Sequence, residues 1–299
     1  MIQPILDAYK TVGVTWLHTV LAPPNLPVAK GTSDKVAAGR IQELCTVRGQ
    51  KTLVDGDFGG GTEQAVRAIQ RAAGLAPDGV VGPAVWAFLI APLLAALKLP
   101  AVTGGFGDTV LQVARQHDLQ NPHEIGGANR GPWVKLYMKG QHGAHLPWCA
   151  GFVSFVLRQA ALATKTKPLY NYEFGCDQLA SLAKSAGTYV KQSEMKPGAS
   201  PAIFLVRNPR NAADWTHTGF GHSFTASAFQ TVEGNGNASG GREGTEVVQL
   251  HRGYASRNFV LLPNTPLAEI DQEASAMFDV ASADIDFIDD NDVVGFDMS

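Results

Sequence analysis

The chain has 299 residues, of which 45% are hydrophobic and only 17% are charged. That balance excludes disorder throughout, and the length predicts two domains with at least one sizeable core. The three cysteines are too few for a disulfide framework, and no apolar run is long enough for a membrane helix. The first residues lack the pattern of a secretory signal. We therefore expect synthesis in the cytoplasm, a reducing compartment, and no membrane insertion.

The charge of the chain is unevenly distributed. Residues 268–299 hold ten Asp and Glu and no Lys or Arg, so the remainder has 24 basic against 17 acidic residues, a net charge of +7. A cationic body is drawn to anionic polymers, but its basic residues are not interleaved with aromatic ones, so we expect no nucleic-acid partner. The acidic tail, residues 263–299, is expected to be solvated and disordered; the alternative is a segment that binds a delivery or immunity partner.

Residues 1–32 form a lead-in segment without a clear pattern, and residues 33–97 have the pattern of three helices. In the first helix, Ser33 is expected to cap a run of apolar residues at helical spacing. The second helix is expected to begin after Thr62 as its N-cap, and the third at Pro83, because the first turn of a helix accepts proline.

The pattern changes after the glycine-rich residues 104–107, which are expected to form a linker. Between residues 107 and 262, helical patterns come first and strand patterns follow. The helical patterns cover residues 108–117, 132–137, 147–162 and 176–186, and the strand patterns cover 203–206, 217–225, 229–232, 247–250 and 259–262. This order predicts an α+β fold class, with a small three-helix bundle followed by helices packed on an antiparallel sheet.

Two glycine-rich turns connect the helices of the three-helix unit. The sequence runs Asp55-Gly56-Asp57-Phe58-Gly59, then Thr62, Gln70 and Gly74, then Asp78-Gly79-Val80-Val81-Gly82-Pro83 with Trp86. Over about 60 residues it resembles the peptidoglycan-binding type 1 repeat family. The resemblance implies a module that binds bacterial peptidoglycan, with Asp57 and Trp86 as contact residues. The alternative is a small bundle that only packs on its neighbour.

Cys149 lies where a helix is expected to begin. Pro147 fits the first turn of the helix over 147–162, so Cys149 would lie among the unpaired N–H groups of its N-terminus. These groups and a nearby imidazole lower the pKa of a thiol, and they can receive the oxyanion that forms when a carbonyl is attacked. The alternative is an ordinary buried cysteine. Cys45 and Cys176 are expected to be structural.

The chain offers eight histidines as the base for such a thiol. Side chains alternate along a strand, so His217 and His222 point to opposite faces and only one of them can face Cys149. His142, His145 and Cys149 are spaced like metal ligands. No second cysteine or carboxylate lies close to them in sequence, so we expect neither a metal nor a cofactor.

Four strings stand in a fixed order around Cys149 and His217. They are Asn129-Arg130-Gly131-Pro132-Trp133, Pro147-Trp148-Cys149-Ala150-Gly151, His217-Thr218-Gly219-Phe220 and Thr231-Val232-Glu233-Gly234-Asn235. Together they resemble the CHAP family of cysteine- and histidine-dependent amidohydrolases and peptidases, which have a papain-like fold and occur in many phage endolysins. The resemblance covers roughly residues 107–262.

The CHAP resemblance implies a role for each matched residue. Cys149 is the nucleophile, His217 is the proton shuttle, and Glu233 or Asn235 orients the imidazole through its other nitrogen. We favour Glu233, because a carboxylate stabilises an imidazolium more than an amide does. Trp148 and Asn129 are the implied substrate contacts. His222 departs from the family pattern, which has an apolar residue at that place.

These features predict an endolysin-like peptidoglycan hydrolase, which acts on the cell wall after release or delivery. It would cleave an amide bond in the peptide portion of the wall, as an N-acetylmuramoyl-L-alanine amidase or as an endopeptidase. One alternative is a non-catalytic wall-binding or virion structural protein with a degenerate enzyme domain. Another is an antibacterial toxin with the same chemistry that is delivered into competitor cells.

Overall fold

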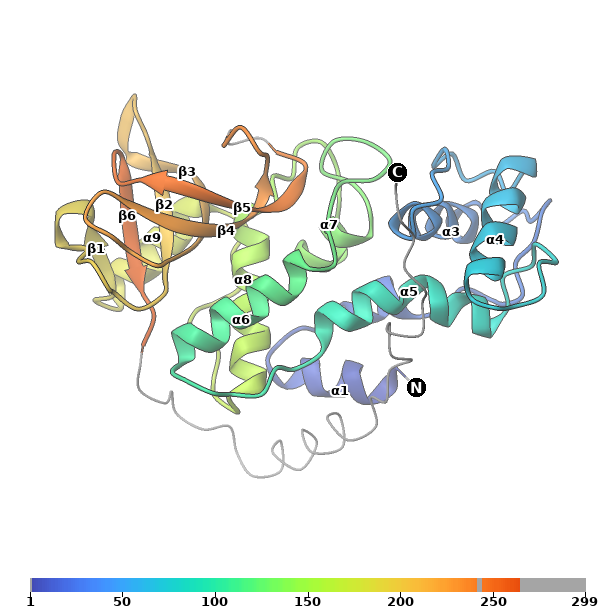
Figure 1. The fold of residues 1–299 in the computed structure, drawn as a ribbon, viewed down its shortest axis with the longest axis horizontal. Coiled ribbons are helices and arrows are strands. Elements are labelled where there is room, and N and C mark those ends of the chain that lie inside the picture. Colours follow the sequence, from blue (N-terminus) through green and yellow to red (C-terminus); the bar gives the residue numbers. More distant parts are fainter. Residues whose placement is uncertain (1, 241–243, 264–299) are drawn as a thin grey trace.

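The computed structural model describes residues 2–240 and 244–263, so the acidic tail beyond Pro263 lies outside the described residues. Helices make up the first part of the chain and an antiparallel sheet the last part, at the left of Figure 1. The helices are α1 (Gln3–Thr11), α2 (Leu17–Leu21), α3 (Lys35–Val47), α4 (Gly60–Ala72), α5 (Pro83–Leu97), α6 (Phe106–Asp118), α7 (Pro132–Tyr137), α8 (Cys149–Ala163) and α9 (Cys176–Ser185). None of the helices in the described ranges is long and apolar enough to cross a membrane. The fold is α+β.

The strands form one antiparallel sheet with the order β1-β6-β2-β3-β4-β5. They are β1 (Tyr189–Lys191), β2 (Ala202–Asn208), β3 (Asn211–His222), β4 (Ala228–Gly236), β5 (Glu246–Gly253) and β6 (Arg257–Leu261). Helix α8 packs against β3 and β4 in the middle of this sheet. The helix that begins at Cys149 therefore lies against the strands that carry His217 and Glu233.

Both faces of the sheet are covered, because apolar side chains alternate along its strands. One set joins the core formed with the helices, and includes Ile203, Leu205, Phe220, Val232 and Val260. The other set forms a smaller cluster of Ala202, Phe204, Phe224, Phe229 and Phe259. The central strands β2, β3 and β4 are thus held from both sides, which makes them a firm support for buried polar groups.

Two helices begin at residues other than those that the sequence predicts. In α3 the N-cap is Asp34 and not Ser33, because the Asp34 carboxylate accepts the N–H three residues further on, at 2.9 Å. Helix α4 has Gly59 as its N-cap, and Thr62 lies within the first turn. The buried Thr62 hydroxyl instead accepts a hydrogen bond from the Gln42 amide at 3.0 Å. Local cap preference is overridden here by a tertiary hydrogen bond.

The two Asp-Gly turns of the three-helix unit are built in the same way. The Gln42 amide donates to Asp55 Oδ1 at 2.8 Å and its carbonyl oxygen accepts the Gly56 N–H at 2.9 Å. One helix later, Gln70 donates to the carboxylate of the second turn at 2.6 Å and accepts the Gly79 N–H at 2.8 Å. Each turn is therefore fastened to the preceding helix by one buried glutamine, which explains why Asp-Gly occurs at both places.

The lead-in, residues 1–32, packs as part of the fold. It contains α1 and α2, for which the sequence shows no clear pattern. The Trp16 indole N–H donates to the Leu136 carbonyl oxygen of α7 at 2.9 Å, and Val28 forms a β-bridge with Val81 just before α5. The segment therefore joins the three-helix unit to the helices that lie under the sheet.

The C-terminal end of α5 is held by side chains from three other helices. Gln116 of α6 and Gln159 of α8 both donate to the Ala96 carbonyl oxygen, at 3.0 and 2.8 Å. The Tyr9 hydroxyl of α1 donates to the Leu97 carbonyl oxygen at 2.8 Å. The last carbonyl groups of a helix have no partner within the helix. Here helix α8, which begins at Cys149, supplies one of the missing hydrogen-bond donors through Gln159.

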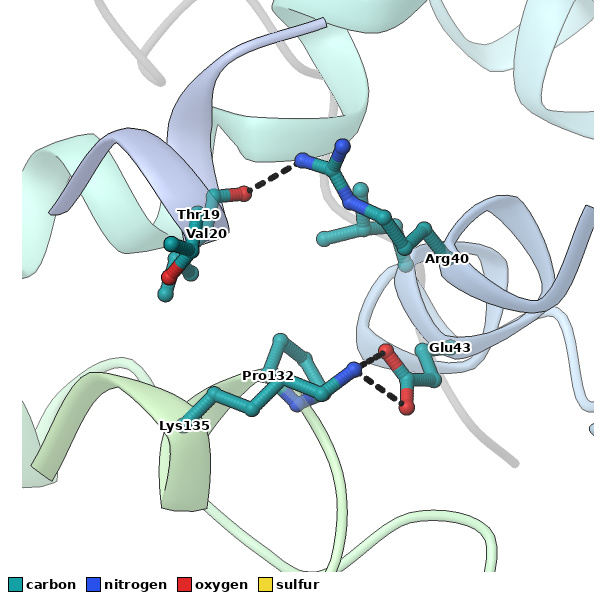
Figure 2. Close-up of a pocket in the computed structure, with 7 residues that line it drawn as sticks. Thr19, Val20, Arg40, Glu43, Pro132 and Lys135 are labelled. Carbon is teal, nitrogen blue, oxygen red and sulfur yellow. Dashed lines mark hydrogen bonds and ion pairs between the residues drawn. The ribbon is translucent and has the colours of Figure 1, made fainter. Parts of the chain in front are cut away.

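A small pocket marks the contact of α3 with α2 and α7 (Figure 2). On one side Lys135 of α7 donates to both carboxylate oxygens of Glu43 of α3, at 2.9 and 2.7 Å. On the other side Arg40 donates to the Val20 carbonyl oxygen at 3.0 Å. Because the Glu43 side chain is only 6% exposed, this ion pair is largely shielded from water. It fixes the three-helix unit to α7.

Candidate functional site

Helix α8 begins at Cys149, with Trp148 as its N-cap residue. Pro147 therefore lies outside the helix and not in its first turn, where the sequence places it. The first hydrogen bond of the helix runs from the Phe152 N–H to the Trp148 carbonyl oxygen at 2.9 Å, so the preceding N–H groups have no acceptor within the helix. One of them, the Ala150 N–H, donates to the Cys149 sulfur. The sulfur thus lies at the positive end of α8.

Two glycines allow neighbouring elements to approach the start of α8. A Cβ on Gly151 would lie 2.6 Å from the Tyr137 carbonyl oxygen of α7. A Cβ on Gly234 of β4 would lie 2.6 Å from the Phe152 Cβ and 2.9 Å from the Trp148 ring. Any larger residue would push α7 or β4 away. The short motif around Cys149 is therefore tied to the strand that carries Glu233.

Glu233 lies at the centre of a buried set of hydrogen bonds. His217 Nε2 lies 2.8 Å from Glu233 Oε2. Arg252 of β5 donates to both carboxylate oxygens, at 2.5 and 2.6 Å, and the Thr231 hydroxyl donates to Oε1 at 2.5 Å. Burial alone would raise the pKa of Glu233, but Arg252 and His217 lower it to about 2. The carboxylate is therefore charged, and its partners fix its orientation.

Cys149 and His217 perturb each other. Burial alone would lower the pKa of His217, but Cys149 and Glu233 raise it to about 9. The pKa of the Cys149 thiol is held well below its usual range, first by a hydrogen bond from Cys176 and then by His217, against the effect of burial. Both shifts favour a thiolate on Cys149 and an imidazolium on His217 over the neutral pair.

The ring nitrogens of His217 have separate tasks. Nε2 is bound to Glu233, and the buried Nδ1 has no hydrogen-bond partner among the described residues. Nδ1 is thus the nitrogen available to exchange a proton with Cys149. This division is the one expected of a nucleophile, a proton shuttle and an orienting carboxylate.

Cys176 is the member of the site that sequence reasoning missed. Its sulfur lies 3.9 Å from the Cys149 sulfur, and both residues are buried. Cys176 is the first residue of α9, whose start is held against β3 by a hydrogen bond from the Trp215 N–H to Asp177 Oδ1 at 2.7 Å. No histidine or second motif lies near Cys176 in the sequence, so only the fold brings the two sulfurs together.

Asn235 does not share the position of Glu233, although two residues separate them. The φ angle of Asn235 is 55°, and the pairing of β4 with β5 shifts register between Glu233 and Gly236. The alternation that predicts a common face breaks at this point. The Asn235 side chain is 1% exposed and has no hydrogen-bond partner among the described residues. Glu233, and not Asn235, holds His217.

The two tryptophans that the family resemblances imply as substrate contacts lie inside the protein. Trp148 stacks on Tyr137 and donates to Glu124 Oε1 at 3.0 Å. Trp86 donates to the Leu21 carbonyl oxygen at 3.0 Å. With 0% and 3% exposure, neither residue has a ring face open to a ligand. Both rings pack within the protein and support the site or the bundle from inside.

The two polar residues expected to contact substrate differ from each other. Asn129 is 5% exposed, and its amide donates to the Ala144 carbonyl oxygen at 3.0 Å, so it fixes the loop before α7. Asp57 is exposed in the turn before α4. Its backbone N–H donates to Asp55 Oδ1 at 2.9 Å and its backbone carbonyl oxygen accepts from the Gln42 amide at 3.0 Å. Of these two, Asp57 is the one whose side chain a ligand can reach.

The other candidate histidines have separate surroundings. His142 Nδ1 accepts the Gly131 N–H at 3.1 Å, and burial together with nearby cations lowers the pKa of its imidazole to about 4. His145 is exposed. His222 lies 3.0 Å from the Ser223 hydroxyl and beside Arg115 of α6, away from Cys149. In the described part of the chain, no three His, Cys, Asp or Glu side chains converge as metal ligands would.

Comparison with known proteins identifies one part of the chain. Residues 46–89 match the model of a family described as a putative peptidoglycan-binding domain. The match extends from the last turn of α3 through α4 into α5 and includes both Asp-Gly turns. No curated protein and no solved structure matches the chain. The match supports the predicted wall-binding module, and with it peptidoglycan as a partner of this protein.

Proposed function

We propose that this protein is a peptidoglycan hydrolase that cleaves an amide bond in the peptide portion of the bacterial wall. The observation that carries the proposal is the buried series of Cys149, His217 and Glu233, in which a thiolate, an imidazolium and a carboxylate lie in sequence. Such a series activates a nucleophile and provides a proton for the leaving group. The peptidoglycan-binding match over residues 46–89 supports the wall as the substrate.

A papain-like, CHAP-type catalytic unit is the finer part of the proposal. It is supported by a cysteine at the first residue of a helix, by the packing of that helix on an antiparallel sheet, and by a histidine and a carboxylate on neighbouring strands. The sequence motifs around these residues resemble the same family. Trp148 and Asn129 have supporting roles in this unit, since both are buried.

In the proposed reaction the Cys149 thiolate attacks the carbonyl carbon of the scissile amide. The N–H groups of Cys149 and Ala150 at the start of α8 stabilise the oxyanion. His217 then gives its Nδ1 proton to the departing amine, which leaves an acyl group bound as a thioester. Water, deprotonated by His217, attacks the thioester and releases the carboxylic acid and the thiolate. Glu233 keeps the imidazole in the required tautomer throughout.

The wall-binding unit would assist by holding the enzyme on an insoluble mesh. A second binding site raises the effective concentration of the first, provided that the geometry lets both engage together. The Glu43–Lys135 ion pair and the packing of α5 hold the two parts in one arrangement. Binding through the exposed face around Asp57 would therefore place the cysteine site at a fixed distance from the bound strand.

Digestion of purified, dye-labelled wall tests the proposal. The full chain is expected to release soluble fragments, and mass spectrometry of these fragments identifies the bond from the new amino and carboxyl ends. A free L-alanine amino group would mark an amidase, and a new end within the peptide would mark an endopeptidase. Wall binding without any fragment release would contradict the proposal and favour the non-catalytic wall-binding protein.

Two histidine variants test the choice of proton shuttle. His217→Ala is expected to lower the rate of fragment release on the order of 10⁴-fold, because the thiolate loses its partner and the leaving amine its proton donor. His222→Ala removes a buried imidazole of the same strand that points to Arg115. It should change the rate by less than about threefold, since contacts to Ser223 and Arg115 affect stability more than chemistry. Equal losses in the two variants would contradict the assignment.

A further inference from the structure

Two helix N-termini meet at the cysteine site. Cys149 is the first residue of α8 and Cys176 is the first residue of α9. Their sulfurs lie 3.9 Å apart, a separation that suits a hydrogen bond between a thiol and a thiolate. At 4% and 7% exposure, both are largely shielded from water, so water cannot readily replace either partner.

The groups around the two sulfurs show which one carries the proton. Cys149 faces the His217 imidazolium and the Ala150 N–H, and both favour a negative sulfur. Cys176 faces the carboxylates of Asp177 and Asp214 and the Cys149 sulfur itself. The Cys149 hydrogen bond, burial and these charges raise the pKa of Cys176 well above its usual range, so it remains a thiol and can donate.

We propose that Cys176 is a positioning residue of this site, whose thiol donates a hydrogen bond to the Cys149 thiolate and holds that sulfur toward the scissile carbonyl. A role of this contact in catalysis rests on the proposed function, whereas the hydrogen bond between the two sulfurs does not depend on it. The hydrogen bond from the Trp215 N–H to Asp177 Oδ1 fastens the start of α9 to β3, and so keeps Cys176 in place. Cys176 then adds a second donor to the Cys149 sulfur, beside the Ala150 N–H, and the charge of the His217 imidazolium favours the same thiolate.

The pH dependence of Cys149 alkylation tests this role without any wall substrate. The full-length protein and its variants are treated with iodoacetamide between pH 4 and pH 10, and the modification of Cys149 is followed by peptide mass spectrometry. In Cys176→Ala we expect the rate on the acidic limb to fall roughly tenfold, the lower end of what a hydrogen bond to a charged group contributes. Cys176→Ser keeps a hydrogen-bond donor, although the hydroxyl oxygen lies slightly farther from the Cys149 sulfur. The alkylation rate should therefore fall less in Cys176→Ser than in Cys176→Ala.

Cys45 provides the matched control, since it is a buried cysteine whose pKa is raised to about 12 by burial and which lies on α3. Cys45→Ala should leave the alkylation profile of Cys149 unchanged, and circular dichroism should show that all variants are folded. If the Cys176→Ala profile overlays that of Cys45→Ala, Cys176 only fills space and the inference fails. Equal losses in the alanine and serine variants would overturn it as well. Failure of the wild-type chain to digest wall would instead contradict the proposed function.

Discussion

Cys149→Ala is expected to abolish release of wall fragments, with a loss on the order of 10⁵-fold or more, because the neighbouring thiol Cys176 has a pKa raised well above its usual range and stays protonated. The substitution removes the only thiolate beside His217, while alanine fits the first turn of a helix. The fold should therefore survive. The measurement is the initial rate of fragment release from purified wall, compared with the same amount of wild-type protein.

Retained wall binding separates loss of chemistry from loss of structure. In a sedimentation assay with insoluble wall, Cys149→Ala should bind as the wild type does, because residues 46–89 lie in a different part of the fold. Cys45→Ala supplies a matched cysteine control and should keep full activity. A Cys149→Ala protein that still digested wall would show that the nucleophile has been assigned wrongly.

Glu233→Gln is expected to lower the catalytic rate by about 10²- to 10⁴-fold, with a smaller change in wall affinity. The amide places an N–H₂ group where Arg252 and Thr231 now donate to a carboxylate, so at least one donor loses its acceptor. The imidazolium of His217 also loses its charged partner. Glu233→Ala should be at least as damaging.

The pH profile gives a readout that a purely structural effect would not produce. The raised pKa of His217, about 9, means that activity of the wild type should decline as the pH rises through about 9, where the leaving amine loses its proton donor. Without the Glu233 carboxylate this alkaline limb should move to lower pH. Glu43→Gln is the matched control: it changes another buried, ion-paired glutamate and should leave the limb in place.

Asn235→Ala tests the alternative orienting residue. Its side chain makes no hydrogen bond to His217 among the described residues, so the loss of rate should be smaller than for Glu233→Gln. A larger loss for Asn235→Ala than for Glu233→Ala would mean that the roles of the two residues must be exchanged. The unpaired amide of Asn235 would then be the group that acts on the ring or on the substrate.

Helices and strands with a strong apolar period could be predicted from the sequence. The limits of α7 agree with the prediction, and α5 begins at Pro83 as expected. What could not be predicted depends on pairing or packing. The strand β1 has only three residues and is defined by its pairing with β6. The polar start of β3 likewise pairs with β2, and α6 begins inside the segment expected to be a linker.

The candidate site divides in the same way. Cys149, His217 and Glu233 lie in short motifs whose residue types, together with the alternation of side chains along the strands, predict a nucleophile with its base. In the structure His217 and Glu233 form a hydrogen bond. Arg252 and Cys176 lie in no such string. An arginine on an edge strand and a cysteine at a helix start are common features, and only the three-dimensional arrangement shows that one fixes the Glu233 carboxylate and the other faces the thiolate.

The way in which α5 ends bears on attempts to retarget proteins of this type by exchanging modules. In a chimaera joined after residue 97, a foreign helix would replace α5. The last carbonyl oxygens of that helix would have to accept the hydrogen bonds that Gln116, Gln159 and Tyr9 now donate to α5. A buried donor left without an acceptor costs about 1–3 kcal/mol, and two of these donors lie on the helices that support the cysteine site. Exchange at this boundary would therefore destabilise the half of the chain that carries Cys149 and His217, whereas surface changes around the Asp57 turn would leave that half intact.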